Sequence, residues 1–148
     1  REPFIARWPG HVPPGTISRE TICLTDLLAT TASIMEVKLP ANAAEDSYDI
    51  LPVLTGKTLN RPIRPATVLQ DSNGNFALRS EQWKLIIPRK AGKVELFDLA
   101  ADLAEKNNLA AKHPELVKSL TAKLTQIIAD GRSTPGAPQK NDEPVSIH

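Results

Sequence analysis

A chain of 148 residues with 18 basic and 17 acidic side chains carries almost no net charge, and the charges are interspersed. This balance excludes a basic patch for nucleic acid, and the apolar runs are too short to span a membrane. The length allows one domain with a core, and 13 prolines indicate a loop-rich protein. Cys23 is the only cysteine, which excludes an internal disulfide, and its apolar neighbours predict a buried thiol whose pKa the acidic Asp26 would raise.

The chain opens on an apolar stretch, Phe4 to Trp8, which predicts a β-strand that runs into a turn rich in Pro and Gly. No start methionine precedes this strand, which indicates a piece of a larger protein. A strand that has lost its neighbours exposes backbone groups that can pair with another chain. We therefore predict that the chain can self-associate through this strand edge.

The first helix is predicted within residues 16–37, with Thr25 as N-cap and Asp26 in the first turn, where the helix dipole favours an acid. Helical spacing predicts one buried face, formed by Leu24, Leu27, Leu28, Thr31, Ile34 and Met35. A single helical turn is predicted over residues 50–54, closed by Gly56.

From residue 66 onward the pattern changes to short strands, predicted over residues 67–70, 76–79, 82–87 and 94–99. An Asn-Gly dipeptide, which readily takes positive φ, marks the turn between the first two. These strands predict an antiparallel sheet of three to four strands.

A second helix is predicted to begin at Pro114, carry an apolar stripe as far as Ile128 and end at Gly131. Packed on the sheet, this helix gives an α+β unit over residues 66–131. Residues 132–148 are polar and rich in proline, which predicts an extended tail.

The residues alone predict no catalytic centre and no metal ligand in this chain. His11, His113 and His148 are too far apart in the sequence for metal-ligand spacing. A cluster of Asp98, Asp102 and Glu105 could suggest a cation site, but such side chains more commonly form turns and caps. Four basic residues of the sheet region predict a weakly basic, solvated face: Lys84, Arg89, Lys90 and Lys93.

Six segments, in this order, resemble the C-terminal third of the arylsulfatase-type sulfatases, within the alkaline-phosphatase-like superfamily. They are Arg1-Glu-Pro-Phe-Ile-Ala-Arg-Trp-Pro-Gly-His-Val-Pro-Pro-Gly15, Leu24-Thr-Asp-Leu-Leu-Ala-Thr-Thr31, Asp49-Ile-Leu-Pro-Val-Leu-Thr-Gly56, Phe76-Ala-Leu-Arg79 with Trp83-Lys-Leu85, Leu96-Phe-Asp-Leu99 with Asp102, Glu105 and Asn108-Leu-Ala110, and Gly131-Arg-Ser-Thr-Pro-Gly136. The resemblance implies that residues 1–60 are a strand–helix segment from the edge of a larger α/β domain. It implies that residues 66–131 are a C-terminal subdomain.

The resemblance also implies a mechanism for the parent enzyme, a sulfuric ester hydrolase. In this family a Cys or Ser in a Cys/Ser-x-Pro/Ala-x-Arg motif becomes formylglycine, and calcium is held by Asp and Asn residues. These groups and a sulfate-binding lysine belong upstream of Arg1, and Cys23 lacks the motif, so no cofactor is expected in this chain. The implied partners are the N-terminal part of the parent sulfatase and a sulfated small molecule or glycan, and the implied location is periplasmic or secreted.

One loop of the chain is predicted to touch substrate. In many relatives the turn before the Phe-Ala-hydrophobic-Arg strand carries histidine and borders the pocket mouth. The corresponding residues here, Gln70, Asp71, Asn73 and Asn75, are the predicted substrate-binding residues. The alternative interpretation is an ordinary hairpin tip, and an unpaired Asp71 would disfavour a nearby anion.

Two other functions stay open at this point. The chain could be a non-catalytic carbohydrate-binding or assembly module, or part of a phosphonate or phosphodiester hydrolase of the same superfamily. The upstream coding sequence distinguishes them, because a Cys/Ser-x-Pro/Ala-x-Arg motif there supports a sulfatase.

Overall fold

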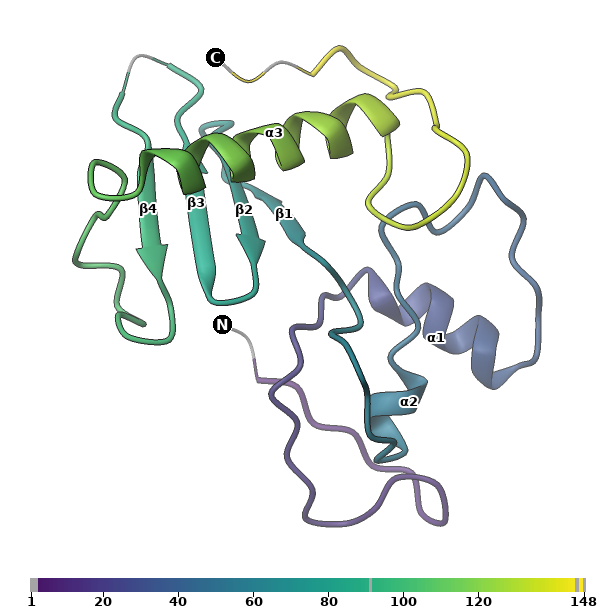
Figure 1. The fold of residues 1–148 in the computed structure, drawn as a ribbon. Helices are drawn as coiled ribbons and strands as arrows, with labels where there is room; N and C mark the ends of the chain where they lie inside the picture. The colour runs from purple at the N-terminus through teal and green to yellow at the C-terminus, as the bar shows by residue number, and fades with distance from the viewer. Residues whose placement is uncertain (1–2, 91, 146, 148) are drawn as a thin grey trace. The chain divides into compact units, whose positions relative to one another are not determined.

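The computed structural model describes residues 3–90, 92–145 and 147, and the chain divides into two compact units, residues 1–64 and 65–148 (Figure 1). The first unit contains the helices α1 (Asp26–Ile34) and α2 (Leu51–Leu54). The second unit contains the strands β1 to β4 and the helix α3. Among the described residues, the helices lack the combination of length and hydropathy that a membrane-spanning helix needs.

The second unit is a four-stranded antiparallel sheet with a helix across it, which confirms the α+β prediction (Figure 1). The sheet order is β1-β2-β3-β4, and the elements are β1 Thr67–Gln70, β2 Phe76–Ser80, β3 Trp83–Ile87, β4 Glu95–Asp98 and α3 Pro114–Asp130. Each strand pairs with the next one along the chain, so every connection within the sheet is a local turn.

The strand register aligns three leucines in a row across the sheet. Leu78 of β2 lies opposite Leu85 of β3, which lies opposite Leu96 of β4, and all three are fully buried. From α3, Leu120 and Leu124 complete the same apolar cluster. Because side chains alternate along a strand, a slip of one residue would turn this row to the other face.

The carboxyl end of α3 is closed by the tail that follows it. Gly131 has φ +60°, and a Cβ at this position would overlap the carbonyl oxygen of Gln139. The Gln139 N–H donates to the carbonyl of Asp130 at 2.7 Å, and Asn141 Nδ2 donates to the carbonyl of Ile128 at 2.7 Å. The tail therefore supplies a donor to the Asp130 carbonyl and a second donor to the Ile128 carbonyl, which also accepts from the Gly131 N–H.

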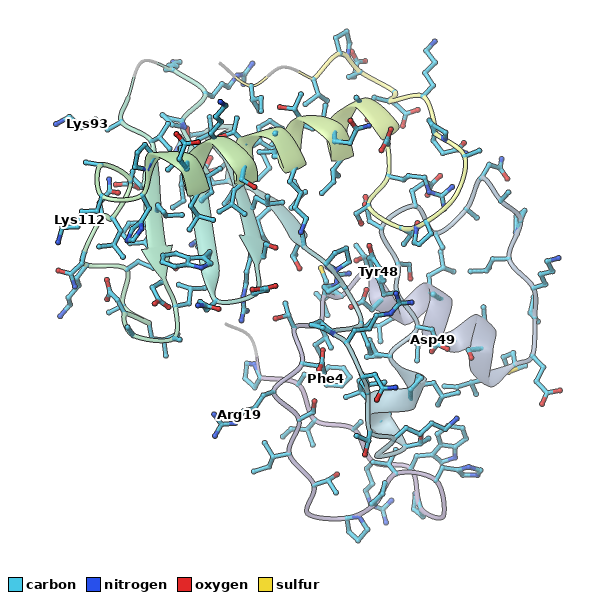
Figure 2. The ribbon with its side chains drawn as sticks, in the orientation of Figure 1. Phe4, Arg19, Tyr48, Asp49, Lys93 and Lys112 are labelled. Carbon is cyan, nitrogen blue, oxygen red and sulfur yellow. The ribbon has the colours of Figure 1, made fainter. Side chains whose placement is uncertain are left out.

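The first unit is built around a buried carboxylate. Asp26 has no exposed surface, and its side chain accepts hydrogen bonds from the Cys23 N–H at 2.7 Å and the Tyr48 N–H at 3.0 Å. Arg64 Nη2 lies 2.5 Å from the same carboxylate and is also buried. Tyr48 and its neighbour Asp49 lie beside α1 (Figure 2). One side chain thus joins three segments that are distant in the sequence.

A hydroxyl extends this polar centre. Thr30 Oγ1 donates to the carbonyl of Asp26 at 2.6 Å and accepts from the Ile50 N–H at 3.0 Å. Ser47 Oγ accepts from the Ala29 N–H at 2.8 Å. These bonds attach residues 47–50 to α1 through polar contacts.

The predicted strand over residues 4–8 is wrong. These residues form no strand, and the Trp8 carbonyl instead accepts from the N–H groups of His11 and Val12 in a turn. A strand is stabilised by pairing, and no described segment pairs with this one. Self-association of the chain stays a prediction, but a strand edge no longer supplies its reason.

The predicted buried face of α1 is also wrong, because its apolar side chains are exposed. Exposure reaches 73% for Leu24, 52% for Leu28 and 66% for Met35. The buried side of α1 carries Asp26 and Thr30 because the polar backbone packed there needs hydrogen-bond partners.

Thr25 precedes α1 as predicted, yet it does not cap the helix with its side chain. Its hydroxyl donates to the carbonyl of Asp46 at 3.1 Å instead.

Candidate functional site

The tip of the β1–β2 hairpin brings the predicted substrate-binding residues together in one turn. The N–H groups of Asn73 and Asn75 each donate to Asp71 Oδ1 at 2.9 Å, and Asn75 Nδ2 donates to Asp71 Oδ2 at 2.8 Å. The Asp71 carbonyl accepts from the Gly74 N–H at 3.0 Å. Asp71 therefore organises the turn with both carboxylate oxygens.

These bonds act on the charge of Asp71. The hydrogen bond from the backbone of Asn75 is the main cause that lowers the pKa of this carboxyl group, and the bonds from Asn73 and Gly74 add to it. The carboxylate is exposed and ionised at neutral pH, and its negative charge is shared with N–H donors. Such sharing reduces the repulsion that a free carboxylate would exert on an anionic ligand.

The four predicted residues do not have equal freedom to contact a ligand. The carboxylate of Asp71 and the amide of Asn75 hold the turn. Gln70 and Asn73 are exposed, and their side chains have no part in the hydrogen bonds that shape this turn. Substrate contact stays a prediction for all four, and the geometry favours Gln70 and Asn73.

Arg89 is a residue of this tip that sequence reasoning missed. Asn75 Oδ1 accepts from the Arg89 N–H at 2.9 Å. Gly74 is buried with φ +83°, and a Cβ there would lie 2.6 Å from Arg89 Cδ, so the arginine side chain packs on the glycine. The strand register predicts this contact. Phe76 pairs with Ile87 in the antiparallel β2–β3 pair, so the residue two positions before Phe76, Gly74, lies opposite the residue two positions after Ile87, Arg89.

Of the four basic residues that the sequence predicts on one solvated face, Lys84 has a different role in the structure. Lys84 Nζ lies 2.7 Å from Glu105 Oε2, in a half-buried ion pair on the sheet. Lys84 therefore holds the loop of Glu105, whereas Arg89 is exposed at the hairpin tip.

The acidic cluster considered as a cation site is a set of turns. Asp98 Oδ1 accepts from the Ala100 N–H at 2.9 Å, and Asp102 Oδ2 accepts from the N–H groups of Lys106 and Asn107 at 2.8 and 2.7 Å. Glu105 pairs with Lys84. Among the described residues, no three His, Cys, Asp or Glu side chains gather as metal ligands would.

The histidines have separate surroundings. His11 stacks on Trp8 with ring centroids 4.0 Å apart, and His113 lies 5.6 Å from the ring of Trp83. His148 lies outside the described residues.

Cys23 departs from its prediction in two respects. It is half-buried rather than buried. Burial raises the pKa of its thiol, but hydrogen bonds with Thr25 and the charge of Arg64 outweigh burial, so the pKa is lowered. Asp26 raises the pKa as expected and is the weakest of these influences. The thiol belongs to the polar centre of the first unit.

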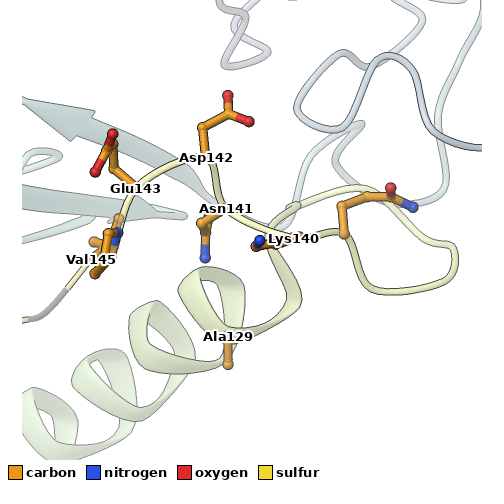
Figure 3. Close-up of a pocket in the computed structure, with 8 residues that line it drawn as sticks. Ala129, Lys140, Asn141, Asp142, Glu143 and Val145 are labelled. Carbon is orange, nitrogen blue, oxygen red and sulfur yellow. The ribbon is translucent and has the colours of Figure 1, made fainter.

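A hollow of about 500 Å³ lies between the tail, residues 139–145, and Ala129 at the end of α3. Asn141 points at the helix end and Asp142 points away from it (Figure 3). A hollow of about 390 Å³ in the first unit is lined by residues 16–20 and by Val53, Gly56, Lys57 and Leu59. The second hollow contains the hydroxyls of Thr16 and Ser18, but Thr16 donates to the Pro13 carbonyl and Ser18 accepts from the Glu20 N–H. Neither hydroxyl is paired with a side-chain base as the nucleophile of a hydrolytic centre would be.

The family described as N-sulphoglucosamine sulphohydrolase, C-terminal, matches residues 1–130. The chain is 36% identical over 141 residues to an N-acetylgalactosamine-6-O-sulfatase of Bacteroides thetaiotaomicron. This match covers 86% of the chain and 27% of that protein. It is 31% identical over 134 residues to arylsulfatase K of Bos taurus, and this match covers 82% of the chain and 24% of that protein. The chain thus spans about a quarter of the length of these curated relatives.

Solved structures agree with this match. A Bacteroides thetaiotaomicron structure, described with the metabolism of multiple glycosaminoglycans, is 34% identical with a TM-score of 0.62, over 69% of this chain and 24% of that one. A second structure, in complex with its substrate D-glucosamine-2-N,6-O-disulfate, is 23% identical with a TM-score of 0.56 over 68% and 22%, and shares the fold. The chain belongs to the sulfatase family and forms its C-terminal region.

Proposed function

We propose that this chain is the C-terminal part of an enzyme that hydrolyses sulfate esters of a sugar or aryl substrate. The observation that carries the proposal is the 36% identity over 141 residues with an N-acetylgalactosamine-6-O-sulfatase. A sulfated glycan is the favoured substrate class, because that relative is named for a sulfated amino sugar. An exported parent enzyme, periplasmic or secreted, is part of the same proposal.

We assign the reacting groups to the N-terminal part of the parent enzyme. The described residues do not fit a calcium site, because the candidate carboxylates accept bonds in their own turns or pair with Lys84. Cys23 is followed by Leu-Thr-Asp and so lacks the motif for conversion to formylglycine. The chain then contributes to binding, and the N-terminal part contributes the chemistry.

The hairpin tip is the proposed point of substrate contact. Gln70 and Asn73 are uncharged amides that can exchange hydrogen bonds with sugar hydroxyls. The exposed guanidinium of Arg89 beside Gly74 is a cation suited to a sulfate oxygen. In this proposal, Asp71 stabilises the turn that carries these side chains and does not itself contact the sulfate group.

The isolated 148-residue chain is expected to release no sulfate from an aryl sulfate in the presence of calcium, because the reacting groups belong to the N-terminal part. A sulfate-release assay measures this against an intact sulfatase of the family. Turnover comparable to the intact enzyme contradicts the assignment. If the upstream coding sequence encodes an unrelated domain and the chain binds glycans, the non-catalytic module is favoured. If the full-length enzyme prefers an aryl phosphodiester to an aryl sulfate, the phosphonate and phosphodiester hydrolases are favoured.

Replacing Gln70 and Asn73 together by alanine in the full-length enzyme is expected to lower kcat/KM for the natural substrate about ten-fold, the effect of losing one or two neutral hydrogen bonds. The turn should persist, since Asp71 and Asn75 are unchanged. Steady-state kinetics measures the effect, with Ser119→Ala on the exposed side of α3 as control. Unchanged kcat and KM in the double variant would reduce the loop to an ordinary hairpin tip.

A further inference from the structure

Arg89, beside the hairpin tip, is held at both its backbone and its side chain. Its N–H donates to Asn75 Oδ1 at 2.9 Å. Its side chain lies across Gly74, where a Cβ would come within 3.1 Å of Arg89 Nη1 and 3.4 Å of Arg89 Nε. Gly74 is buried, whereas Arg89 itself is exposed. The guanidinium therefore rests on the turn and keeps its outer side open to a ligand.

This arrangement restricts a side chain that is usually mobile. A long arginine side chain loses rotamer freedom when it binds a ligand, and this loss weakens the binding. Because Gly74 has φ +83° and no Cβ, the Arg89 side chain can settle on the turn before any ligand arrives. The turn therefore preorganises a cation, and an anion that binds there restricts little further motion.

The charge of Arg89 is left for an external ligand. Two ion pairs form among the described residues, and Arg89 belongs to neither of them. Asp71, the acid of the same turn, uses its carboxylate to accept from the N–H groups of Asn73 and Asn75. A fixed guanidinium whose charge is not balanced within the protein is a binding group for a carboxylate or a sulfate.

The connection that carries Arg89 is basic. β1 and β3 run in the same direction, so the β1–β2 turn and the β3–β4 connection lie at the same end of the sheet (Figure 1). Lys90 and Lys93 are exposed in this connection, and residues 82–94 contain no Asp or Glu. Lys93 points away from the sheet (Figure 2). The positive potential of the two lysines raises the local concentration of anions near the tip.

We infer that Arg89 binds a second anionic group of the substrate, a carboxylate or a sulfate other than the one that is hydrolysed. The inference rests on the proposed function, which assigns the reacting groups to the N-terminal part of the enzyme. The resemblance places the lysine that binds the reacting sulfate in that part as well. Arg89 is then a specificity-determining residue, which favours glycans with more than one negative charge over singly charged sugars and aryl sulfates.

A simpler role for Arg89 is to cover Gly74 with the aliphatic part of its side chain. That role predicts that any long side chain suffices. Arg89→Met keeps a long side chain and removes the charge. Arg89→Lys keeps the charge and removes the planar fork that pairs with an oxyanion through two hydrogen bonds. Lys112→Ala removes an exposed positive charge elsewhere in the second unit and is the control.

Steady-state kinetics of the full-length enzyme tests the inference. The probes are monosulfated N-acetylgalactosamine, the same sugar with a second sulfate, and a disaccharide that joins glucuronate to the monosulfated sugar. The readout is kcat/KM for a doubly charged probe divided by kcat/KM for the monosulfated sugar. We expect Arg89→Met to lower this ratio about ten-fold or more, mainly through KM, as the loss of a hydrogen bond to a charged group does. Arg89→Lys should fall between, and Lys112→Ala should leave the ratio unchanged.

The same measurements identify the anion. A loss confined to the disulfated sugar identifies a sulfate, a loss confined to the disaccharide identifies the carboxylate, and a loss with both shows that Arg89 accepts either oxyanion. If the carboxylate is the ligand, its methyl ester should lower the ratio in the unchanged enzyme and not in Arg89→Met. A ratio that Arg89→Met leaves unchanged for both doubly charged probes overturns the inference.

Chemical protection separates a failure of this inference from a failure of the proposed function. Phenylglyoxal modifies exposed guanidinium groups, and peptide mass spectrometry follows the rate at Arg89 in the full-length protein. A doubly charged probe at about ten times its Kd should slow this rate about ten-fold, and the monosulfated sugar should slow it less. Protection in a protein that releases no sulfate supports the inference and contradicts the proposed function. Absence of protection overturns the inference, and sulfate release from the monosulfated sugar then leaves the proposed function intact.

Discussion

Replacing Asp26 by alanine is expected to lower the free energy of unfolding of the first unit by about 3–5 kcal/mol, the usual cost of breaking a buried ion pair. The change removes the carboxylate that balances the charge of Arg64, whose side chain is 4% exposed. It also removes the acceptor of the N–H groups of Cys23 and Tyr48. Buried donors that lose an acceptor are costly, so we expect a loss toward the upper end of this range.

Urea unfolding followed by amide hydrogen exchange at Tyr48 and Ile50 measures this loss. Lys38→Ala, an exposed change in the same unit, is the control and should stay within about 0.5 kcal/mol of the unchanged protein. Asp26→Asn keeps the size of the side chain and one oxygen, and should fall between the two. A loss below about 1 kcal/mol in Asp26→Ala would show that the polar centre does not hold the unit together.

Replacing Leu124 by alanine is expected to destabilise the second unit by about 2–5 kcal/mol, the range for emptying a buried leucine site. Leu124 is fully buried in the cluster that joins α3 to the row of leucines on the sheet. A cavity between a helix and a regular sheet closes poorly, because both elements are held by their own backbone hydrogen bonds.

The midpoint of urea unfolding, with exchange protection of the β2 and β3 amides, measures this effect. Leu103→Ala removes the same atoms from a side chain that is 57% exposed, and should change stability by less than about 0.5 kcal/mol. Equal effects of the two variants would show that the leucine cluster is not the core of the unit.

The sheet and α3 could be predicted because their signals are local. Pro114 begins the helix and Gly131 ends it with positive φ, as the sequence indicated. The β1–β2 turn contains Asn73-Gly74 and the β3–β4 connection contains Gly92, and these residues favour reversal of the chain. Each of these features is settled by residues a few positions apart.

The first unit could not be predicted in the same way, because its structure depends on distant pairs. Periodicity showed which residues share a side of α1, but it cannot tell which side the chain covers. The inward side was decided by Asp26 and its partner Arg64, 38 positions later. The strand over residues 4–8 failed for a related reason, since pairing needs a second segment.

The hairpin tip lies between these two cases. The turn at Asp71 follows from local chemistry, because an aspartate before Asn-Gly accepts hydrogen bonds from the residues that follow it. The position of Arg89 beside Gly74 depends on strand register, and single-sequence patterns give register poorly.

The attachment of Asn141 to the end of α3 has a consequence for how this protein is made. A polypeptide is synthesised from its amino terminus to its carboxyl terminus, so the residues of α3 are made before Asn141. The Ile128 carbonyl accepts first from the Gly131 N–H, three positions later, and gains a second donor, Asn141, thirteen positions later. The Asp130 carbonyl receives its donor only from Gln139 in the tail, so the last turn of α3 frays in water until the tail is made. Full closure of this helix end is therefore a late event in biosynthesis, because it needs the tail as well as Gly131.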